Sequence, residues 1–170
     1  GPVVASAVTV GPGNIPPGIA DSKALEADAR ERIYPRIVES AVVGVGIADV
    51  TRIDRDNILA ATLWAMREAV ARLGDVSLAL VDGNRAPQVS CTVQTIVGGD
   101  AKSLSIAAAS IIAKVTRDRM MIALDADHPH YGFARHKGYG TALHHQSLLR
   151  HGPCVHHRLS FAPIAALLKR

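Results

Sequence analysis

Two aspartates that each follow a strand-like run are the residues of this chain best suited to chemistry. Asp82 comes after the apolar run Leu78–Val81, and Asp100 comes after the run Cys91–Val97 and two glycines. If the two runs are neighbouring strands, both carboxylates lie on one rim of a sheet. Hard divalent cations need oxygen ligands supplied in this way. The pattern therefore indicates a metal site at that rim.

The same residues also have a purely structural interpretation. Asp82 is followed by Gly83, and Asp-Gly after a strand is a common turn signal. The run Gly98-Gly99-Asp100 can equally be a loop before a helix. The local pattern leaves both interpretations open.

Strands and amphipathic helices alternate along the chain and must position these aspartates. Strand-like runs are expected at 1–10, 41–49, 78–81 and 91–97. Helices are expected at 20–39, 55–73, 103–127, 141–150 and 162–169, the first with Asp21 or Ser22 as its N-cap. This alternation favours an α/β layer architecture.

The length of the chain and the distribution of its charged residues predict how the chain is organised. A chain of 170 residues is expected to form one globular protein, and it contains no apolar run long enough for a membrane span. Residues 128–170 hold six Lys or Arg, all eight histidines and no acidic residue. We therefore expect a core at 1–127 and a basic C-terminal segment at 128–170 that contacts a polyanion. A charged solvated surface is the alternative.

The two cysteines and the N-terminal residues suggest a compartment. Cys91 and Cys154 are too few for a disulfide framework, and no basic region followed by an apolar stretch opens the chain. A reduced, cytoplasmic protein is the expectation. Both thiols are expected to be inert, because a nucleophilic cysteine requires an oriented histidine and a lowered pKa.

Two further polar residues stand at expected helix starts. Lys23 falls in a first helical turn, where the helix dipole disfavours a cation but a bound phosphate would favour one. An ordinary exposed lysine is the alternative. Asn57 falls in the first turn of the 55–73 helix, as a substrate contact or as a helix cap.

Five strings of the sequence, taken in order, resemble bacterial ribonuclease HII. They are GPVVASAV, ADSK, VDGNR, GGD followed by SIAAASIIAKVTRD, and HKGYGT. The resemblance implies a ribonuclease H-like mixed sheet flanked by helices, with a C-terminal extension of helices and loops. It also implies an endonuclease that uses Mg²⁺ or Mn²⁺ to cut the RNA strand of RNA–DNA hybrids, and DNA on the 5′ side of embedded ribonucleotides.

The same resemblance implies roles for single residues. Asp82 and Asp100 match two of the four carboxylates that hold metal in the family, and both are expected to be catalytic. Lys23, Asn57 and Arg117 match positions that contact substrate or support the site. Tyr139 matches the tyrosine that packs on the sugar beside the ribonucleotide, where a ring can test for a 2′-hydroxyl. A monomer is expected.

One departure from the family pattern limits the expected activity. The family carries its other two carboxylates, an adjacent Asp-Glu pair, on a strand before the segment that matches Gly1–Val4, and the given sequence has no such pair there. We therefore expect residues 1–170 to cleave poorly. The alternative is a protein of the same fold that binds nucleic acid without cutting it.

A histidine metal site is a third hypothesis. Its candidate ligands are His128, His130, His144, His145, His156 and His157. Loops separate these pairs, and zinc sites usually combine suitably spaced histidines with cysteine or acid. Histidines near a polyanion site need no metal, so this hypothesis is the weakest of the three.

Overall fold

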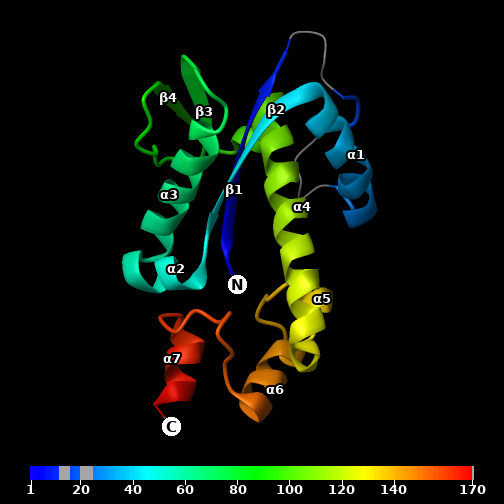
Figure 1. Ribbon diagram of the computed structural model, residues 1–170, viewed down its shortest axis with the longest axis vertical. Helices are drawn as coiled ribbons and strands as arrows, with labels where there is room; N and C mark the ends of the chain where they lie inside the picture. The colour runs from blue at the N-terminus through cyan, green and yellow to red at the C-terminus, as the bar shows by residue number, and fades with distance from the viewer. Residues whose placement is uncertain (12–15, 20–24, 170) are drawn as a thin grey trace. The chain divides into compact units, whose positions relative to one another are not determined.

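A computed structural model describes residues 1–11, 16–19 and 25–169 of the chain (Figure 1). The strands are β1 (Val3–Val10), β2 (Ala41–Ala48), β3 (Leu78–Asp82) and β4 (Thr92–Ile96). The helices are α1 (Ala27–Ser40), α2 (Val50–Asp56), α3 (Ile58–Ala71), α4 (Leu104–Asp127), α5 (Phe133–His136), α6 (Ala142–His151) and α7 (Ala162–Leu168), with short 3₁₀ turns η1 (Gly99–Ala101) and η2 (Pro129–Tyr131). No helix in these ranges is both long enough and apolar enough to cross a bilayer.

The chain forms two compact units. The strand unit contains Val4–Ile47 and Thr62–Val115, and the C-terminal unit contains Gly1–Val3, Ala48–Ala61 and Thr116–Arg170. The strand unit holds both strand pairs, and the C-terminal unit holds α5, α6 and α7. The division expected at residues 127 and 128 stays a prediction.

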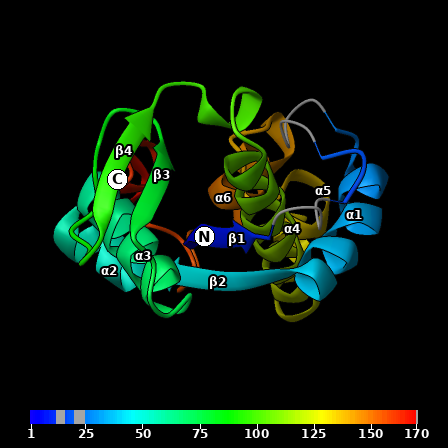
Figure 2. The same ribbon diagram turned by 90° about the horizontal axis from the view of Figure 1, so that it is seen from above.

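All four expected strands are confirmed, but they pair two by two. Within the described residues β1 pairs with β2 and β3 pairs with β4, the latter in parallel with Leu78 opposite Thr92 (Figure 2). A groove of about 600 Å³ is lined by β1 and β3 and by residues of α3 and α4. Strands β1 and β3 are therefore not paired with each other. Both line the same groove.

An aliphatic core holds the strand unit together. The buried cluster takes one face of α4, two residues of α1 and one of β1: Val8, Ile33, Ile37, Ala108, Ile111, Ile112 and Val115. Strand β2 lies tightly against α3, since a Cβ added at Gly44 or Gly46 would overlap the carbonyl of Ala69 or Ala65. These two glycines are thus required by close backbone approach, as their place in a strand suggests.

Two helix boundaries differ from the sequence expectation. The expected N-cap, Asp21 or Ser22, lies outside the described residues, and α1 begins only at Ala27 because Glu26 has an extended backbone with ψ 156°. The helix expected at 55–73 is observed as α3, but it begins at Ile58 instead of Arg55. Asn57, with φ 69°, ends a short preceding helix, α2, that was not expected.

Candidate active site

The carboxyl ends of β3 and β4 meet at one edge of the strand unit. Asp82 is the last residue of β3 and stands opposite Ile96, the last residue of β4. The Gly83 N–H donates to the Ile96 carbonyl at 3.0 Å and extends the pairing past the strand end. Parallel strands bring their carboxyl ends to the same edge, so the chain leaves β4 beside Asp82.

The glycines after β4 bring Asp100 to that edge. Gly98 adopts φ 65°, a left-handed conformation that glycine adopts at little cost. The turn directs the Gly99 N–H to Asp82 Oδ1, at 2.8 Å, and a Cβ on Gly99 would lie 2.6 Å from Ile106 Cδ1. Asp100 follows in η1 and is 8% exposed. The structure thus places both aspartates at one edge, as the strand pattern predicted.

This donor set fits a hard divalent cation. Asp82 is exposed, and both residues offer carboxylate oxygens, the donors that Mg²⁺ and Mn²⁺ prefer. Mg²⁺ is commonly held by one or two protein carboxylates together with substrate phosphates. Among the described residues, no three His, Cys, Asp or Glu gather where they could hold a metal ion. Asp82 and Asp100 therefore offer a partial site.

In the C-terminal unit a sharp turn presents Tyr139. Lys137 and Gly138 both have left-handed backbones, with φ of 51° and 79°. The Lys137 N–H closes α5 on the Phe133 carbonyl at 2.8 Å, and the Tyr139 N–H returns to the His136 carbonyl at 2.9 Å. Tyr139 is 59% exposed. The turn thus holds the backbone of Tyr139 while its ring faces solvent.

Arg117 supports this turn from α4. Its Nε donates to the Pro2 carbonyl at 3.1 Å, and its Nη1 donates to the Lys137 carbonyl at 3.0 Å. Its guanidinium carbon lies 5.7 Å from the centre of the Tyr139 ring, within range of a cation–π interaction. In this arrangement Arg117 fixes the base of the turn and places a positive charge beside the exposed ring.

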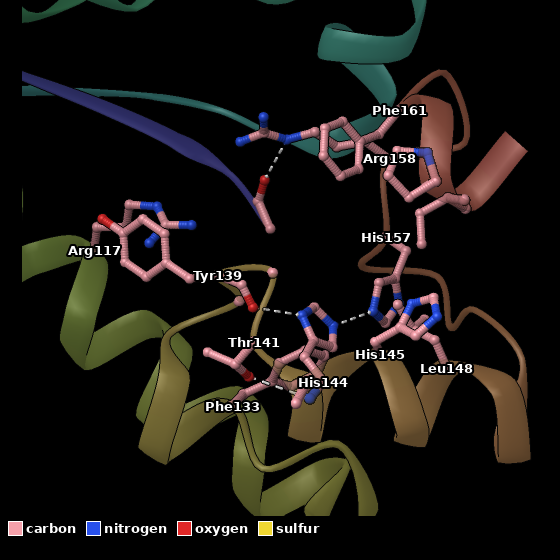
Figure 3. Close-up of a pocket in the computed structure, with 16 residues that line it drawn as sticks. Arg117, Phe133, Tyr139, Thr141, His144, His145, Leu148, His157, Arg158 and Phe161 are labelled. Carbon is pink, nitrogen blue, oxygen red and sulfur yellow. Dashed lines mark hydrogen bonds between the residues drawn. The ribbon is translucent and has the colours of Figure 1, made fainter.

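A cavity of about 490 Å³ opens next to Tyr139 (Figure 3). Arg117, Tyr139, Thr141, His144, Arg158 and Phe161 are among its lining residues. Arg158 donates from Nε to the Gly1 carbonyl at 3.0 Å. Burial and the nearby charge of Arg117 lower the pKa of Arg158, in that order of importance, yet a guanidinium stays protonated at neutral pH. Arg117 and Arg158 thus place two positive charges on a largely apolar cavity wall, where an anionic group could pair with them.

Of the two other residues predicted to contact substrate, Asn57 is described by the structure and Lys23 is not. Asn57 ends α2 and caps α3, because its Oδ1 accepts from the N–H groups of Leu59 and Ala60 at 3.0 and 3.1 Å. The cap interpretation is thus confirmed, and a substrate contact by Asn57 stays a prediction. Lys23 lies outside the described residues.

The sequence interpretation did not single out Arg158, Thr141 or the environment of His144. Thr141 Oγ1 accepts from the His144 N–H at 3.2 Å and caps α6. A threonine just before a helical pattern is a recognisable N-cap signal. No local signal identifies Arg158, because its role depends on residues far away in the sequence.

The histidines of the C-terminal unit pair with one another and with backbone groups. His144 Nε2 lies 3.0 Å from His157 Nε2, and the ring of His128 contacts those of His130 and His156 edge-on. Burial and the neighbouring His144 lower the pKa of His157 to about 4. The described residues contain no cluster of three such ligands, so the structure gives the histidine metal hypothesis no support.

Comparison with known sequences gives a consistent result. The profile of the family "Ribonuclease HII" matches residues 1–164. Ribonuclease HII of Azorhizobium caulinodans is 55% identical over 167 residues, which are 98% of this chain and 64% of the relative. Ribonuclease HII of Rhizorhabdus wittichii is 55% identical over 166 residues, 97% of this chain and 82% of the relative. Against three of the similar relatives, the chain spans 64 to 66% of their length.

Solved structures show the same fold at low sequence identity. A chain of the PCNA:RNase HII complex from Archaeoglobus fulgidus matches with a TM-score of 0.79 at 23% identity, covering 100% of this chain and 91% of that chain. Bst-RNase HIII in complex with Mn²⁺ matches with a TM-score of 0.76 at 20% identity, covering 99% and 65%. The architecture is therefore the α/β fold of the ribonuclease H type.

Proposed function

Since this chain belongs to the ribonuclease HII family, we propose that it takes part in cutting the RNA strand of RNA–DNA hybrids, and DNA on the 5′ side of embedded ribonucleotides. The observation that carries the proposal is the placement of Asp82 and Asp100 at one edge of the parallel β3–β4 pair. In metal-dependent phosphodiester hydrolysis the main task of the protein is to hold the metal, and paired carboxylates can do this.

Asp82 and Asp100 would hold a divalent cation, Mg²⁺ or Mn²⁺. When bound, such a cation makes a water molecule a better nucleophile and stabilises the charge on the leaving 3′ oxygen, which leaves a 5′-phosphate on the other product. The Gly99 N–H fixes one oxygen of Asp82 and so orients that carboxylate before any ligand arrives. Asp100, which is largely buried, is held in place beside it.

The C-terminal unit would recognise the nucleic acid. The exposed ring of Tyr139 is available to pack on a sugar, where it can test for a 2′-hydroxyl. Arg117 and the basic residues of 128–170 would neutralise phosphates. Lys23 and Asn57 are proposed as further substrate contacts on the strength of the family pattern.

The groove between β1 and β3 supports a further part of the proposal. Each of these strands has one edge outside its pair and facing the groove, and such backbone edges pair readily with an added strand. We propose that full activity requires an extended strand in this groove, bearing the adjacent Asp-Glu pair that the family pattern implies. With only Asp82 and Asp100, residues 1–170 would bind one cation weakly and cleave slowly.

The second candidate function is binding without cleavage. The cavity beside Tyr139 favours it, because Arg117 and Arg158 lie on its wall and the site is formed without any contribution from the carboxylates. In this case the chain would hold a hybrid duplex with salt-dependent affinity and release it unchanged.

A cleavage assay on duplex DNA with one ribonucleotide, in Mg²⁺ or Mn²⁺, tests the proposal. Residues 1–170 are compared with a form extended by a strand that carries the Asp-Glu pair, each with and without Asp82→Asn. We expect the extended form to cut on the 5′ side of the ribonucleotide at least about a hundredfold faster than residues 1–170. We also expect Asp82→Asn to remove that activity, because it removes a metal ligand.

Asp28→Asn is the matched control, since Asp28 is an exposed aspartate of the strand unit that lies neither at the proposed site nor on the groove between β1 and β3. Equal cleavage by both lengths would contradict the requirement for a further strand. Binding of the duplex with no cleavage by either length would favour the second candidate function.

A further inference from the structure

A buried chain of imidazoles leads to the backbone of Tyr139 in the C-terminal unit. His144 Nδ1 lies 2.9 Å from the Tyr139 carbonyl oxygen, and His144 Nε2 lies 3.0 Å from His157 Nε2 (Figure 3). His157 Nδ1 lies 3.0 Å from the Cys154 backbone nitrogen and 3.2 Å from its Sγ. His144 and His157 are 7% and 5% exposed. Both rings therefore expose little surface, although they line the cavity beside Tyr139.

The partners of each nitrogen determine where the protons are. A carbonyl oxygen can only accept, so the Tyr139 contact requires a proton on His144 Nδ1. His144 Nε2 is then an acceptor in the neutral ring, and His157 Nε2 must donate to it. His157 Nδ1 is left to accept from the Cys154 N–H. Every ring nitrogen has a matched partner when both imidazoles are neutral.

Burial keeps both rings in that neutral form. It is the largest cause that lowers the pKa of His157, to about 4, and it also lowers the pKa of His144. Protonation of His144 would place a second proton between the two Nε2 atoms, and protonation of His157 would place a proton on Nδ1 facing the Cys154 N–H, so either event breaks a bond of the chain. At neutral pH the pair is thus a fixed structural element and not a proton shuttle.

The backbone around Tyr139 is held at several points. Its carbonyl also accepts from the Thr141 N–H at 2.8 Å, and its N–H donates to the His136 carbonyl at 2.9 Å. The His136 ring stacks on His144 with centroids 4.4 Å apart and an interplanar angle of 17°. The ring of Tyr139, by contrast, is largely in solvent. The backbone below it and the Arg117 guanidinium beside it therefore both bear on the direction of the ring.

We propose that His144 and His157 are positioning residues for Tyr139, and that they fix the direction in which its ring meets a nucleotide sugar. This inference rests on the proposed role of Tyr139 in ribonucleotide recognition. A recognition group has to be held within about 0.5 Å of its productive place to discriminate well. The network supplies that support from side chains below the turn, two of which also line the cavity beside Tyr139.

Two substitutions at one position separate the hydrogen bond from the bulk of the side chain. His144→Asn keeps an amide N–H near the place of Nδ1 and can still donate to the Tyr139 carbonyl. His144→Gln moves the amide to the place of Nε2 and loses that contact. His151→Gln is the control, because His151 is an exposed histidine on the same helix and lies outside the cavity beside Tyr139. Helix content by circular dichroism checks that each variant is folded.

The first measurement is the affinity ratio between DNA duplexes with and without one ribonucleotide, without divalent cations so that nothing is cut. We expect His144→Gln to lower the ratio at least about threefold, with affinity for the all-DNA duplex within about twofold of wild type. His144→Asn and His151→Gln should keep the wild-type ratio. A purely structural role of His144 would lower both affinities together and leave their ratio unchanged.

The second measurement needs no nucleic acid. Fluorine NMR of the chain labelled with 3-fluorotyrosine gives one line for each of its three tyrosines. We expect the Tyr139 line to narrow or shift in His144→Gln but not in His144→Asn, while the lines of Tyr34 and Tyr131 stay in place. Nitrogen-15 spectra should show the proton on Nδ1 of His144 and on Nε2 of His157.

The outcomes separate the two claims. A wild-type chain that does not distinguish the two duplexes overturns the proposed role of Tyr139. A wild-type chain that does distinguish them, together with a His144→Gln chain that distinguishes them equally well, overturns the positioning role alone. The opposite tautomers, or an unchanged Tyr139 line in His144→Gln, also overturn it.

Discussion

The two units of this protein are stabilised by different kinds of interaction. The strand unit is built on a cluster of aliphatic side chains along α4, and Asp100 is its only buried polar residue among those described. The C-terminal unit has a smaller apolar cluster and contains His136, His144, Ser147 and His157, the other buried polar residues of the described chain. Both units are packed around apolar side chains, but the C-terminal unit also depends on satisfied hydrogen bonds among buried polar side chains.

This difference suits the proposed tasks of the two units. A carboxylate pair that holds a cation needs a rigid frame, and close-packed aliphatic side chains provide one at any pH. A recognition loop needs a defined backbone without much apolar material around it, and directional hydrogen bonds provide that. The contrast predicts that volume changes affect the strand unit most and that pH affects the C-terminal unit most.

Removing aliphatic volume from the strand unit should have the largest effect on stability. Ile111 is fully buried in the aliphatic cluster, so Ile111→Ala should lower the free energy of unfolding by about 3 to 4 kcal/mol. Ile122 on the same helix is 48% exposed, and Ile122→Ala should cost less than about 1 kcal/mol. Urea denaturation of both variants measures the difference. Equal decreases in the free energy of unfolding would show that the packing of Ile111 does not stabilise the strand unit more than an exposed side chain does.

Acidification should weaken the C-terminal unit through His157. Because its pKa falls from 6.5 to about 4 on folding, the unfolded chain takes up a proton in this range before the folded one does. The stabilisation is complete above about pH 6.5 and decreases as the pH falls towards 4, by at most about 3 kcal/mol. His157→Gln should flatten this dependence in urea titrations between pH 4 and 7. His145→Gln should not, and an unchanged slope in His157→Gln would contradict the prediction.

A smaller effect is expected at Asp54, which anchors the segment before α7. Its carboxylate accepts hydrogen bonds from the N–H groups of Leu159 and Ser160 and from the Ser160 hydroxyl. Burial alone would raise the pKa of Asp54, but these bonds lower it. Asp54→Asn should cost about 1 kcal/mol in urea denaturation, because an amide accepts more weakly than a carboxylate. Asp75→Asn is the control, and an equal effect of both would argue against the anchor.

Local pattern was sufficient for most of the secondary structure. β-Branched runs gave all four strands, and the apolar periodicity after Ser103 gave α4. It failed before Asn57, where a non-glycine residue with φ 69° ends an unexpected helix, α2, and sets the start of the expected helix at Ile58. A side chain that caps the following helix stabilises this uncommon backbone, and periodicity alone does not reveal it.

Part of the candidate site could likewise be predicted from local sequence, and part could not. Asp82 and Asp100 follow strand ends directly, so a sequence that predicts the strands also predicts where the carboxylates lie. The supports of Tyr139 come from Arg117, His144 and His157, which are separated from it by 5 to 22 positions and belong to three different elements or loops. No local rule connects them, since each contact depends on how the chain folds back.

The sequence by itself determined the family, the strands and helices, and the two carboxylates at the strand ends, because each of these depends on residues that are close together in the chain. Only the tertiary structure decided that the strands pair two by two around a groove, and that neutral imidazoles hold the turn below Tyr139. Strand pairing and buried hydrogen bonds join residues that are distant in sequence. Their partners are chosen by burial and geometry, which appear only when the chain is folded.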